Sequence, residues 1–251
     1  MAADRADVGV ATAYSTIAAN LQSVHERIAT AARAAGRDPA SVTLIAVSKT
    51  MGATVVAEAA RAGATALGEN RVQEAEEKVP EVARLLADPA APAVAPAWHL
   101  IGHLQTNKAR AAARLFDVIH SVDSLRLAQA LARQAAAGPR PLQVLLQVNV
   151  AGEASKGGFA PDELRRAATA LAGLDALAFG GLMTVASLTD SQDALMAVFQ
   201  ALRQQFLELA GVFPTPAWQH LSMGMSNDFE LAIAEGATLV RIGRAIFGER
   251  G

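Results

Sequence analysis

The chain has 251 residues, with 22 basic and 24 acidic side chains, a formal net charge of −2 and no cysteine. This length fits a single α/β barrel or one large α/β domain as well as two smaller domains. The balanced charge and the lack of a long basic stripe argue against nucleic acid and anionic membranes as partners. The absence of cysteine excludes disulfides and thiolate metal sites and fits a reducing compartment. No stretch approaches the roughly 18 apolar residues of a membrane span, and residues 1–8 lack an apolar signal core, so we expect a soluble cytoplasmic protein.

The first predicted element is a long helix. Residues 1–10 are a short polar start that we expect to be disordered, and residues 12–35 then carry apolar side chains three or four apart. These side chains are Ile17, Leu21, Val24, Ile28 and Ala31. Because this spacing places them on one face and Gly36 follows, it predicts an N-terminal helix that ends at Gly36.

From residue 42 onward, short apolar runs alternate with longer amphipathic ones. The short runs predict eight strands, at residues 42–48, 66–68, 98–102, 118–121, 143–150, 177–182, 218–222 and 239–242. The longer runs predict helices at residues 54–62, 72–86, 108–115, 125–137, 162–172, 191–209 and 229–235, with a short turn from residue 245. This alternation predicts one domain over residues 1–251, a single (β/α)8 TIM barrel with the extra helix before it. A Pro/Ala-rich run at residues 88–96 is predicted to be an inserted loop.

A lysine follows the first predicted strand. Lys49 ends an apolar run that begins at Thr43 and is rich in β-branched residues. The chemistry of a barrel takes place at the carboxyl ends of its strands, where the loops converge. Burial lowers the pKa of a lysine, which can then form an imine with an aldehyde or a ketone. The alternative is an ordinary lysine whose ammonium group reaches solvent past the strand end.

The last predicted strand carries an arginine on its inner face. Arg241 shares this face with Leu239 and Gly243, because side chains alternate along a strand. An arginine inside a barrel must meet a carboxylate, a phosphate or another acceptor. Either a bound ligand or an internal ion pair, for instance with Glu69, therefore explains Arg241.

Glycine occurs at two neighbouring strand ends, in residues 222–226 and 242–248. Small residues between a strand and a helix let backbone N–H groups approach an anion. The loops after the seventh and eighth strands are also where many barrels hold phosphate. Tight turns would explain either glycine alone, but the two together favour a phosphate site.

Several other polar residues allow more than one interpretation. Asn70 can supply a neutral donor or acceptor near the lysine, or it can cap a helix. Lys156 lies in a glycine-bearing loop and is typical of an exposed loop charge. His99 and His103 have no carboxylate at a metal-binding spacing, so we predict no metal site. The phosphate loop, the dinucleotide fingerprint and the nucleophile elbow are also absent.

Seven motifs, in order from about residue 42 to residue 248, resemble the pyridoxal 5′-phosphate homeostasis protein family. They are residues 46–50 (AVSKT), 68–74 (GENRVQE), 98–108 (WHLIGHLQTNK), 121–123 (SVD), 181–183 (GLM), 221–226 (LSMGMS) and 240–243 (VRIG). The resemblance implies a single barrel similar to the N-terminal domain of alanine racemase. It also implies that pyridoxal 5′-phosphate is bound through a lysine Schiff base, without established catalytic turnover.

The resemblance also implies roles for individual residues. Lys49 corresponds to the Schiff base lysine, Arg241 to the group that faces the pyridine nitrogen, and Asn70 to a residue beside the ring. Lys156 corresponds to a secondary lysine that accepts the cofactor during transfer. The implied phosphate cradle, much of it backbone N–H, consists of Ser222, Gly224, Ser226 and Gly243. Two departures are Met51, where some members have another lysine, and the insertion at residues 88–96.

Three functions remain in competition. An arginine at the pyridine nitrogen weakens the ring as an electron sink, which favours a carrier or buffer that delivers pyridoxal phosphate to apo enzymes. The first alternative is an amino-acid racemase or decarboxylase, but a two-base racemase needs a second acid/base on the opposite face of the substrate. The chain has no cysteine, its one tyrosine is Tyr14 in the N-terminal helix, and we expect no added β-domain and a monomer. The second alternative is a Schiff base aldolase without cofactor.

Overall fold

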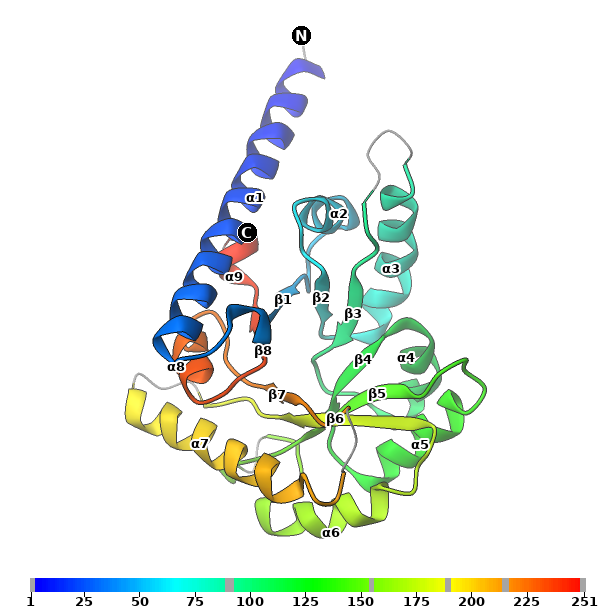
Figure 1. Cartoon of the computed structure of the whole chain (residues 1–251). Helices are drawn as coiled ribbons and strands as arrows, with labels where there is room; N and C mark the ends of the chain where they lie inside the picture. The colour runs from blue at the N-terminus through cyan, green and yellow to red at the C-terminus, as the bar shows by residue number, and fades with distance from the viewer. Residues whose placement is uncertain (1–2, 89–92, 154–155, 188–190, 214–216, 249–251) are drawn as a thin grey trace.

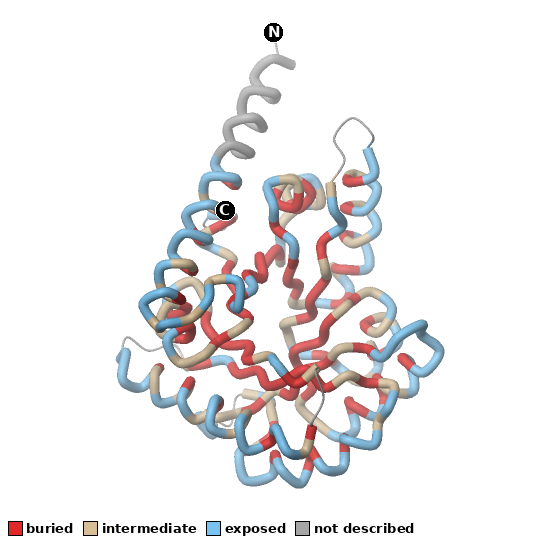
Figure 2. The backbone as a smooth tube through the Cα atoms, in the orientation of Figure 1, coloured by how far each residue is buried: buried red, intermediate tan, exposed pale blue. Residues whose placement is uncertain are grey.

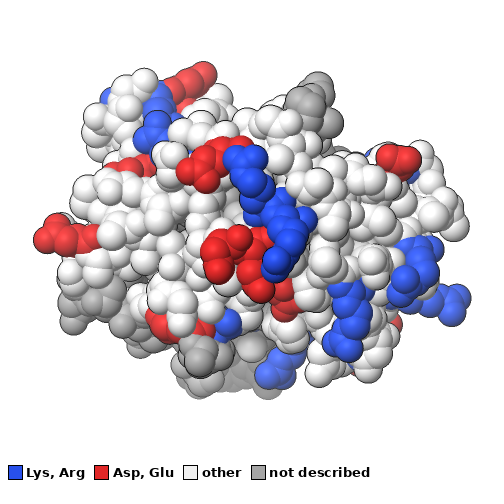
Figure 3. All heavy atoms as spheres, turned by 90° about the horizontal axis from the view of Figure 1, so that it is seen from below, with Lys and Arg blue, Asp and Glu red and all other residues white. Residues whose placement is uncertain are grey.

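The computed structural model describes residues 3–88, 93–153, 156–187, 191–213 and 217–248. Figure 1 shows a ring of parallel strands with helices around it. No helix in the described ranges is both long enough and apolar enough to cross a membrane. The face seen in Figure 3 carries basic side chains beside acidic ones.

Eight parallel strands form the closed barrel in chain order, β1 to β8. They are Thr43–Val47 (β1), Ala66–Glu69 (β2), Ala97–Leu100 (β3), Val118–Val122 (β4), Leu142–Gln147 (β5), Leu177–Met183 (β6), His220–Ser222 (β7) and Leu239–Ile242 (β8). The predicted (β/α)8 barrel is therefore confirmed, with strand ends that differ by a few residues. The largest difference is at β5, which ends at Gln147 rather than at residue 150. There the Asn149 amide donates to the carbonyls of Glu153 and Lys156, so the backbone turns into a loop.

The helices are Ala3–Ala34 (α1), Ala53–Arg61 (α2), Val72–Leu86 (α3), Ala109–Leu115 (α4), Leu125–Ala135 (α5), Pro161–Leu171 (α6), Gln192–Leu209 (α7), Phe229–Ala234 (α8) and Arg244–Phe247 (α9), with 3-10 turns at Pro39–Ser41 (η1) and Thr106–Lys108 (η2). The α1 helix lies beside α8 and α9 (Figure 1). It buries Leu21, Val24 and Ile28, as the apolar spacing predicts.

Two predictions about irregular segments have different outcomes. Residues 3–10 are helical, so the disorder expected for residues 1–10 is wrong over this range. Extending an existing helix gains a backbone hydrogen bond for each residue added, whereas starting one is costly, and α1 extends in this way through a polar segment. The predicted loop at residues 88–96 has no regular structure at residue 88 or at residues 93–96. Residues 89–92 lie outside the described ranges.

The apolar core has two parts. One large cluster fills the space between the strands and the surrounding helices, and the central strands in Figure 2 are correspondingly buried. A small cluster fills the barrel interior and consists of Ile45, Ala66, Leu145, Met183 and Leu239. Strand alternation separates the two clusters: Val240 and Ile242 pack outward in the large cluster, whereas Leu239 faces inward. Arg241 therefore points into the barrel, as its position on the strand predicts.

A chain of buried polar side chains also crosses the barrel interior. His99 on β3 and His120 on β4 share a hydrogen bond of 2.9 Å between Nδ1 and Nε2. The other ring nitrogen of His120, Nδ1, lies 2.9 Å from the hydroxyl of Ser222 on β7. The guanidinium group of Arg241 on β8 donates to the same hydroxyl at 2.6 Å and to the Thr184 carbonyl at 2.9 Å. We call His99, His120, Ser222 and Arg241 the interior polar chain.

Burial keeps both histidines of the interior polar chain neutral. Desolvation lowers the pKa of His99 to about 4. The pKa of His120 is lowered well below its usual value, first by desolvation and then by the neighbouring His99 and Arg241. Because a protonated imidazole would stand in a desolvated site beside a cation, both rings are neutral near pH 7.

The buried His99 makes stability depend on pH. In the unfolded chain His99 titrates near 6.5, and in the folded protein its pKa is about 4, so the unfolded state binds more protons between these values. Stability therefore falls as the pH drops through this range. From pH 7 to pH 5 we expect His99 to reduce the free energy of unfolding by about 2 kcal/mol.

Urea unfolding of wild type and His99→Gln at the two pH values measures this effect. The variant should lose about 2 kcal/mol less than wild type between pH 7 and pH 5. The exposed His25 provides the matched control, because His25→Gln makes the same substitution at a histidine that is not buried. Equal pH dependence in wild type and His99→Gln would contradict the assignment.

Candidate cofactor-binding site

The predicted site residues lie at the carboxyl ends of neighbouring strands. Lys49 follows β1 by two residues, and Asn70 comes directly after β2. Ser222 ends β7, Gly224 and Ser226 follow it, and Gly243 comes directly after β8. In the closed ring β7 pairs with β8, β8 with β1 and β1 with β2, so these residues share one side of the barrel rim. Lys156 is on a different part of this rim, in the loop after β5.

Lys49 is half-buried, and its backbone is held on both sides. On one side the fully buried Ser48 donates its hydroxyl to Glu69 at 2.6 Å, and its carbonyl accepts from the ammonium group of Lys78 at 2.8 Å. On the other side the Thr50 N–H donates to Glu74 at 2.5 Å. Thr50 has a φ of 67°, the left-handed conformation that residues with a side chain rarely adopt. This arrangement holds the turn that carries Lys49 in one conformation.

A single buried lysine connects these contacts. Lys78 on α3 is 6% exposed and also contacts the carboxylates of Glu69 at 2.8 Å and Glu74 at 2.6 Å. We call Lys78, Glu69, Glu74 and Ser48 the lysine clamp. Burial raises the pKa of Glu69, while hydrogen bonds from Lys78 and Ser48 act in the opposite direction. The proposed ion pair between Arg241 and Glu69 is therefore wrong, because Glu69 pairs with Lys78 and Arg241 bonds to a hydroxyl and a carbonyl.

Sequence reasoning missed the role of Lys78. The signal was present, because Glu74 and Lys78 are four apart and Lys78 lies between Ala75 and Val82 on the buried side of α3. A lysine within such an apolar stripe is expensive to bury unless carboxylates meet it. Only the tertiary structure indicates which carboxylates these are.

The two glycines of the predicted phosphate cradle are closely packed. Gly224 has a φ of 91°, and a Cβ atom there would lie 2.7 Å from the Cβ of Ala232. A Cβ atom at Gly243 would lie 3.2 Å from the carbonyl oxygen of Val47 at the end of β1. Without side chains, these backbones can approach each other and an anionic ligand closely.

Two predicted site residues have specific surroundings. The hydroxyl of Ser222 is engaged inside the barrel with Arg241 and His120, and its carbonyl accepts from the N–H of Thr184 at 3.1 Å. Lys156 is half-buried rather than an exposed loop charge. Its ammonium group contacts Glu153 at 3.2 Å, the Val185 carbonyl at 3.3 Å and the Ser187 hydroxyl at 3.2 Å.

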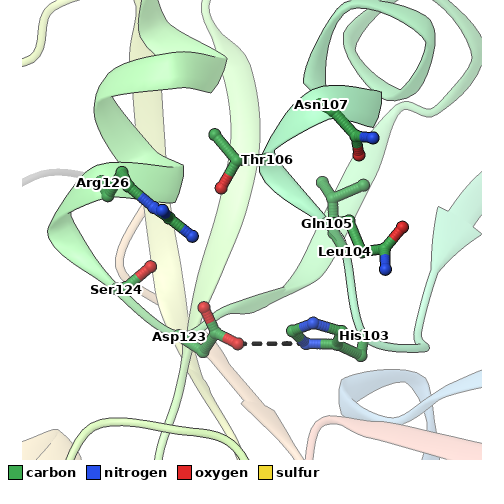
Figure 4. Close-up of a pocket in the computed structure, with 8 residues that line it drawn as sticks. All are labelled: His103, Leu104, Gln105, Thr106, Asn107, Asp123, Ser124 and Arg126. Atoms are coloured by element: carbon green, nitrogen blue, oxygen red, sulfur yellow. Dashed lines mark ion pairs between the residues drawn. The ribbon is translucent and has the colours of Figure 1, made fainter.

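Two cavities open on other parts of the rim. A cavity of about 440 Å³ follows β3 and β4 and is lined by His103, Leu104, Gln105, Thr106, Asn107, Asp123, Ser124 and Arg126. Figure 4 shows His103 and Asp123 pointing toward each other, and they form an ion pair of 3.1 Å. A smaller cavity of about 180 Å³ lies beside Lys156.

His99 and His103 face different surroundings, and the described residues contain no cluster of three or more side chains suited to a metal ion.

The residues present fit pyridoxal 5′-phosphate. A half-buried lysine suits its aldehyde, the close-packed glycine turns offer backbone to its phosphate, and Arg241 lies inside the same side of the barrel. Among the described residues, the hydrogen-bond acceptors of Arg241 are neutral groups. The chemistry of this donor set is therefore compatible with the cofactor.

The lysine clamp predicts a large loss of stability when Lys78 is removed. Lys78→Met leaves Glu69 buried without its counter-charge, so we expect the free energy of unfolding to fall by about 3 kcal/mol or more. Adding Glu69→Gln should restore part of this loss, because no uncompensated charge then remains. Arg84→Met is the matched control on the same helix, because its ion pair with Glu81 is exposed to solvent and its loss should cost much less stability. Equal losses for Lys78→Met and Arg84→Met in urea unfolding would refute the clamp.

The chain is similar to known proteins over most of its length. Residues 19–251 match the family model for the alanine racemase N-terminal domain. The pyridoxal phosphate homeostasis protein of Pseudomonas aeruginosa is 49% identical over 236 residues, which cover 94% of this chain and 96% of the relative. The protein of the same name from Escherichia coli K12 is 42% identical over 235 residues, which cover 93% of this chain and 97% of the relative.

A solved structure agrees with these relatives. The structure of PipY from Synechococcus elongatus with PLP bound has a TM-score of 0.78 and 39% identity, and the match covers 92% of this chain and 100% of that chain. The resemblance of the sequence motifs is thus confirmed by relatives that align over nearly their full length. The chain belongs to the pyridoxal phosphate homeostasis protein family, with a barrel of the alanine racemase N-terminal type.

Proposed function

We propose that this protein binds pyridoxal 5′-phosphate through a Schiff base to Lys49 and acts as a carrier or buffer of the cofactor in the cytoplasm. The observation that carries this proposal is the lysine clamp, which holds the turn of Lys49 beside the glycine ends of β7 and β8. The family of the chain and the PLP-bound PipY structure support the choice of cofactor.

Each part of the cofactor has a counterpart among these residues. The amine nitrogen of Lys49 replaces the aldehyde oxygen, which leaves as water, and hydrolysis reverses the bond. The backbone of Gly224, Ser226 and Gly243 binds the phosphate, with the backbone of Ser222 beside it. Arg241 faces the pyridine nitrogen, and Asn70 lies beside the ring. When bound, the cofactor supplies an electron sink, which an arginine at the pyridine nitrogen weakens.

The site supports binding better than catalysis. Racemisation requires a second acid/base on the face of the substrate opposite Lys49. Tyr14, the single tyrosine, belongs to α1, and this helix packs outside the barrel against α8 and α9. A reversible carrier needs a held lysine, an anion site and access to water, and all three are available at this rim. The recipients we propose are apo enzymes that use pyridoxal phosphate, with the carrier acting as a monomer.

Lys156 is the proposed secondary lysine. It lies beside the smaller cavity, where its ammonium group contacts one carboxylate, one carbonyl and one hydroxyl. These contacts fix its position beside the cavity, and the ammonium group must lose a proton before it can accept the cofactor aldehyde after release from Lys49. Because Lys156 is not part of the lysine clamp, its loss should slow transfer to an apo enzyme without abolishing binding.

Absorbance spectroscopy of the purified protein with added pyridoxal phosphate tests the proposal. Wild type should show the absorbance of an imine, Lys49→Ala should lose it, and Lys156→Ala should keep it. Borohydride reduction followed by mass spectrometry should find the pyridoxyl group on Lys49. An unchanged spectrum in Lys49→Ala would contradict the proposal.

Assays of turnover separate the alternatives. Racemisation or decarboxylation of amino acids by wild type, abolished in Lys49→Ala, would favour the enzyme. Borohydride trapping of a carbonyl substrate without any pyridoxyl group would favour an aldolase that needs no cofactor. We expect neither result, and we expect loaded wild type to activate an apo enzyme in the same solution.

A further inference from the structure

The interior polar chain lies directly behind the proposed cofactor site. Its four members come from β3, β4, β7 and β8 and are all at most 6% exposed. His120 is fully buried at its centre and uses both ring nitrogens, one toward His99 and one toward Ser222, each at 2.9 Å. The histidine rings meet edge to face, with centroids 5.1 Å apart. The imidazole of His120 thus connects β3 and β4, through Ser222, to Arg241 on β8.

The direction of the hydrogen bonds follows from Arg241. A guanidinium group can only donate, so the Ser222 hydroxyl accepts from it. The hydroxyl proton then needs an acceptor of its own, and the contact that the structure gives it is Nδ1 of His120. His120 therefore carries its proton on Nε2 and donates it to Nδ1 of His99. Each bond in the chain sets the direction of the next.

We propose that His120 is a positioning residue for the cofactor, because it orients the Ser222 hydroxyl that holds Arg241 against the pyridine ring. This inference rests on the proposed function, in which Arg241 faces the pyridine nitrogen. His120 lies inside the barrel, whereas the proposed cofactor contacts lie at the rim and at Arg241. It acts through two intermediate groups, Ser222 and the guanidinium group.

The surroundings of Arg241 explain why such a positioning residue is needed. In the part of the chain that the structure describes, Arg241 makes no ion pair with a carboxylate, and its fixed partners are one hydroxyl and one carbonyl. A carboxylate at this place would hold the guanidinium group tightly but would neutralise it toward a ligand. The neutral side chains of Ser222 and His120 hold its direction instead, while the buried carboxylate of Asp228 acts on Arg241 as a nearby charge rather than as an ion-pair partner.

Two conservative variants separate the two ends of the His120 ring. His120→Asn keeps an acceptor near the position of Nδ1, so it preserves the contact with Ser222 and loses the contact with His99. His120→Gln keeps a donor near the position of Nε2, so it preserves the contact with His99 and loses the contact with Ser222. Both substitutions remove an aromatic ring from the same buried place, so their effects on stability should be similar.

Cofactor titration followed by absorbance, together with thermal unfolding, provides the measurements. His120→Gln should raise the Kd for pyridoxal phosphate about tenfold and shift the absorbance maximum of the bound imine. His120→Asn should keep the Kd within about twofold of wild type and leave the maximum unchanged. If His120→Gln fails to fold, Ser222→Ala removes the acceptor of Arg241 and should show the same shift.

The outcomes distinguish this inference from the proposed function. Absence of imine absorbance in wild type would refute the proposed function itself. Imine absorbance in wild type with the same Kd and maximum in His120→Gln would refute only the role of His120. Equal losses of affinity in His120→Asn and His120→Gln, in step with their melting temperatures, would show that His120 is merely structural and would also overturn the inference.

Discussion

The pairing of the last strand with the first is the constraint on which the site depends. Thr43 to Ala46 on β1 lie beside Leu239 to Ile242 on β8, although almost the whole barrel separates them in sequence. This pairing places Arg241 beside Ile45 and brings Gly243 against Val47, two residues before Lys49. A proposed phosphate site and a proposed covalent anchor thereby become neighbours. Without closure, Lys49 and Arg241 would belong to opposite edges of an open sheet.

Two buried polar systems support this rim, and their physical characters differ. The lysine clamp contains charges of both signs, since Lys78 lies between Glu69 and Glu74. Attraction between opposite charges is strong in a desolvated place, so the clamp holds the turn of Lys49 firmly. The interior polar chain has one cation, and its histidines are neutral because burial lowers their pKa values. A firmly held turn at Lys49 and a guanidinium group with neutral hydrogen-bond partners thus arise from two different uses of burial.

Binding a cofactor and catalysing a reaction with it require different groups at the rim of such a barrel. Anchoring a cofactor requires a nucleophile, an anion site and a fixed orientation, and these are the roles proposed for the residues of this rim. Turnover additionally requires groups that move protons at defined substrate atoms. The His103 and Asp123 pair lies at a separate cavity after β3 and β4, away from the clamp that holds Lys49. This separation is the reason for proposing a holder of the cofactor.

The sequence by itself determined the barrel, the order of its elements and most of the rim residues. The alternation of side chains along β8 predicts that Arg241 points into the barrel, and the polar residues at strand ends predict the position of the rim. Both predictions rest on the periods of strands and helices, which are local properties of the sequence. The sequence did not determine the partners of buried charges. Glu69 pairs with Lys78 on the following helix rather than with Arg241, and His120 on β4 reaches Ser222 on β7 across the closed barrel. Such pairings depend on distances between packed elements, which the tertiary structure alone decides.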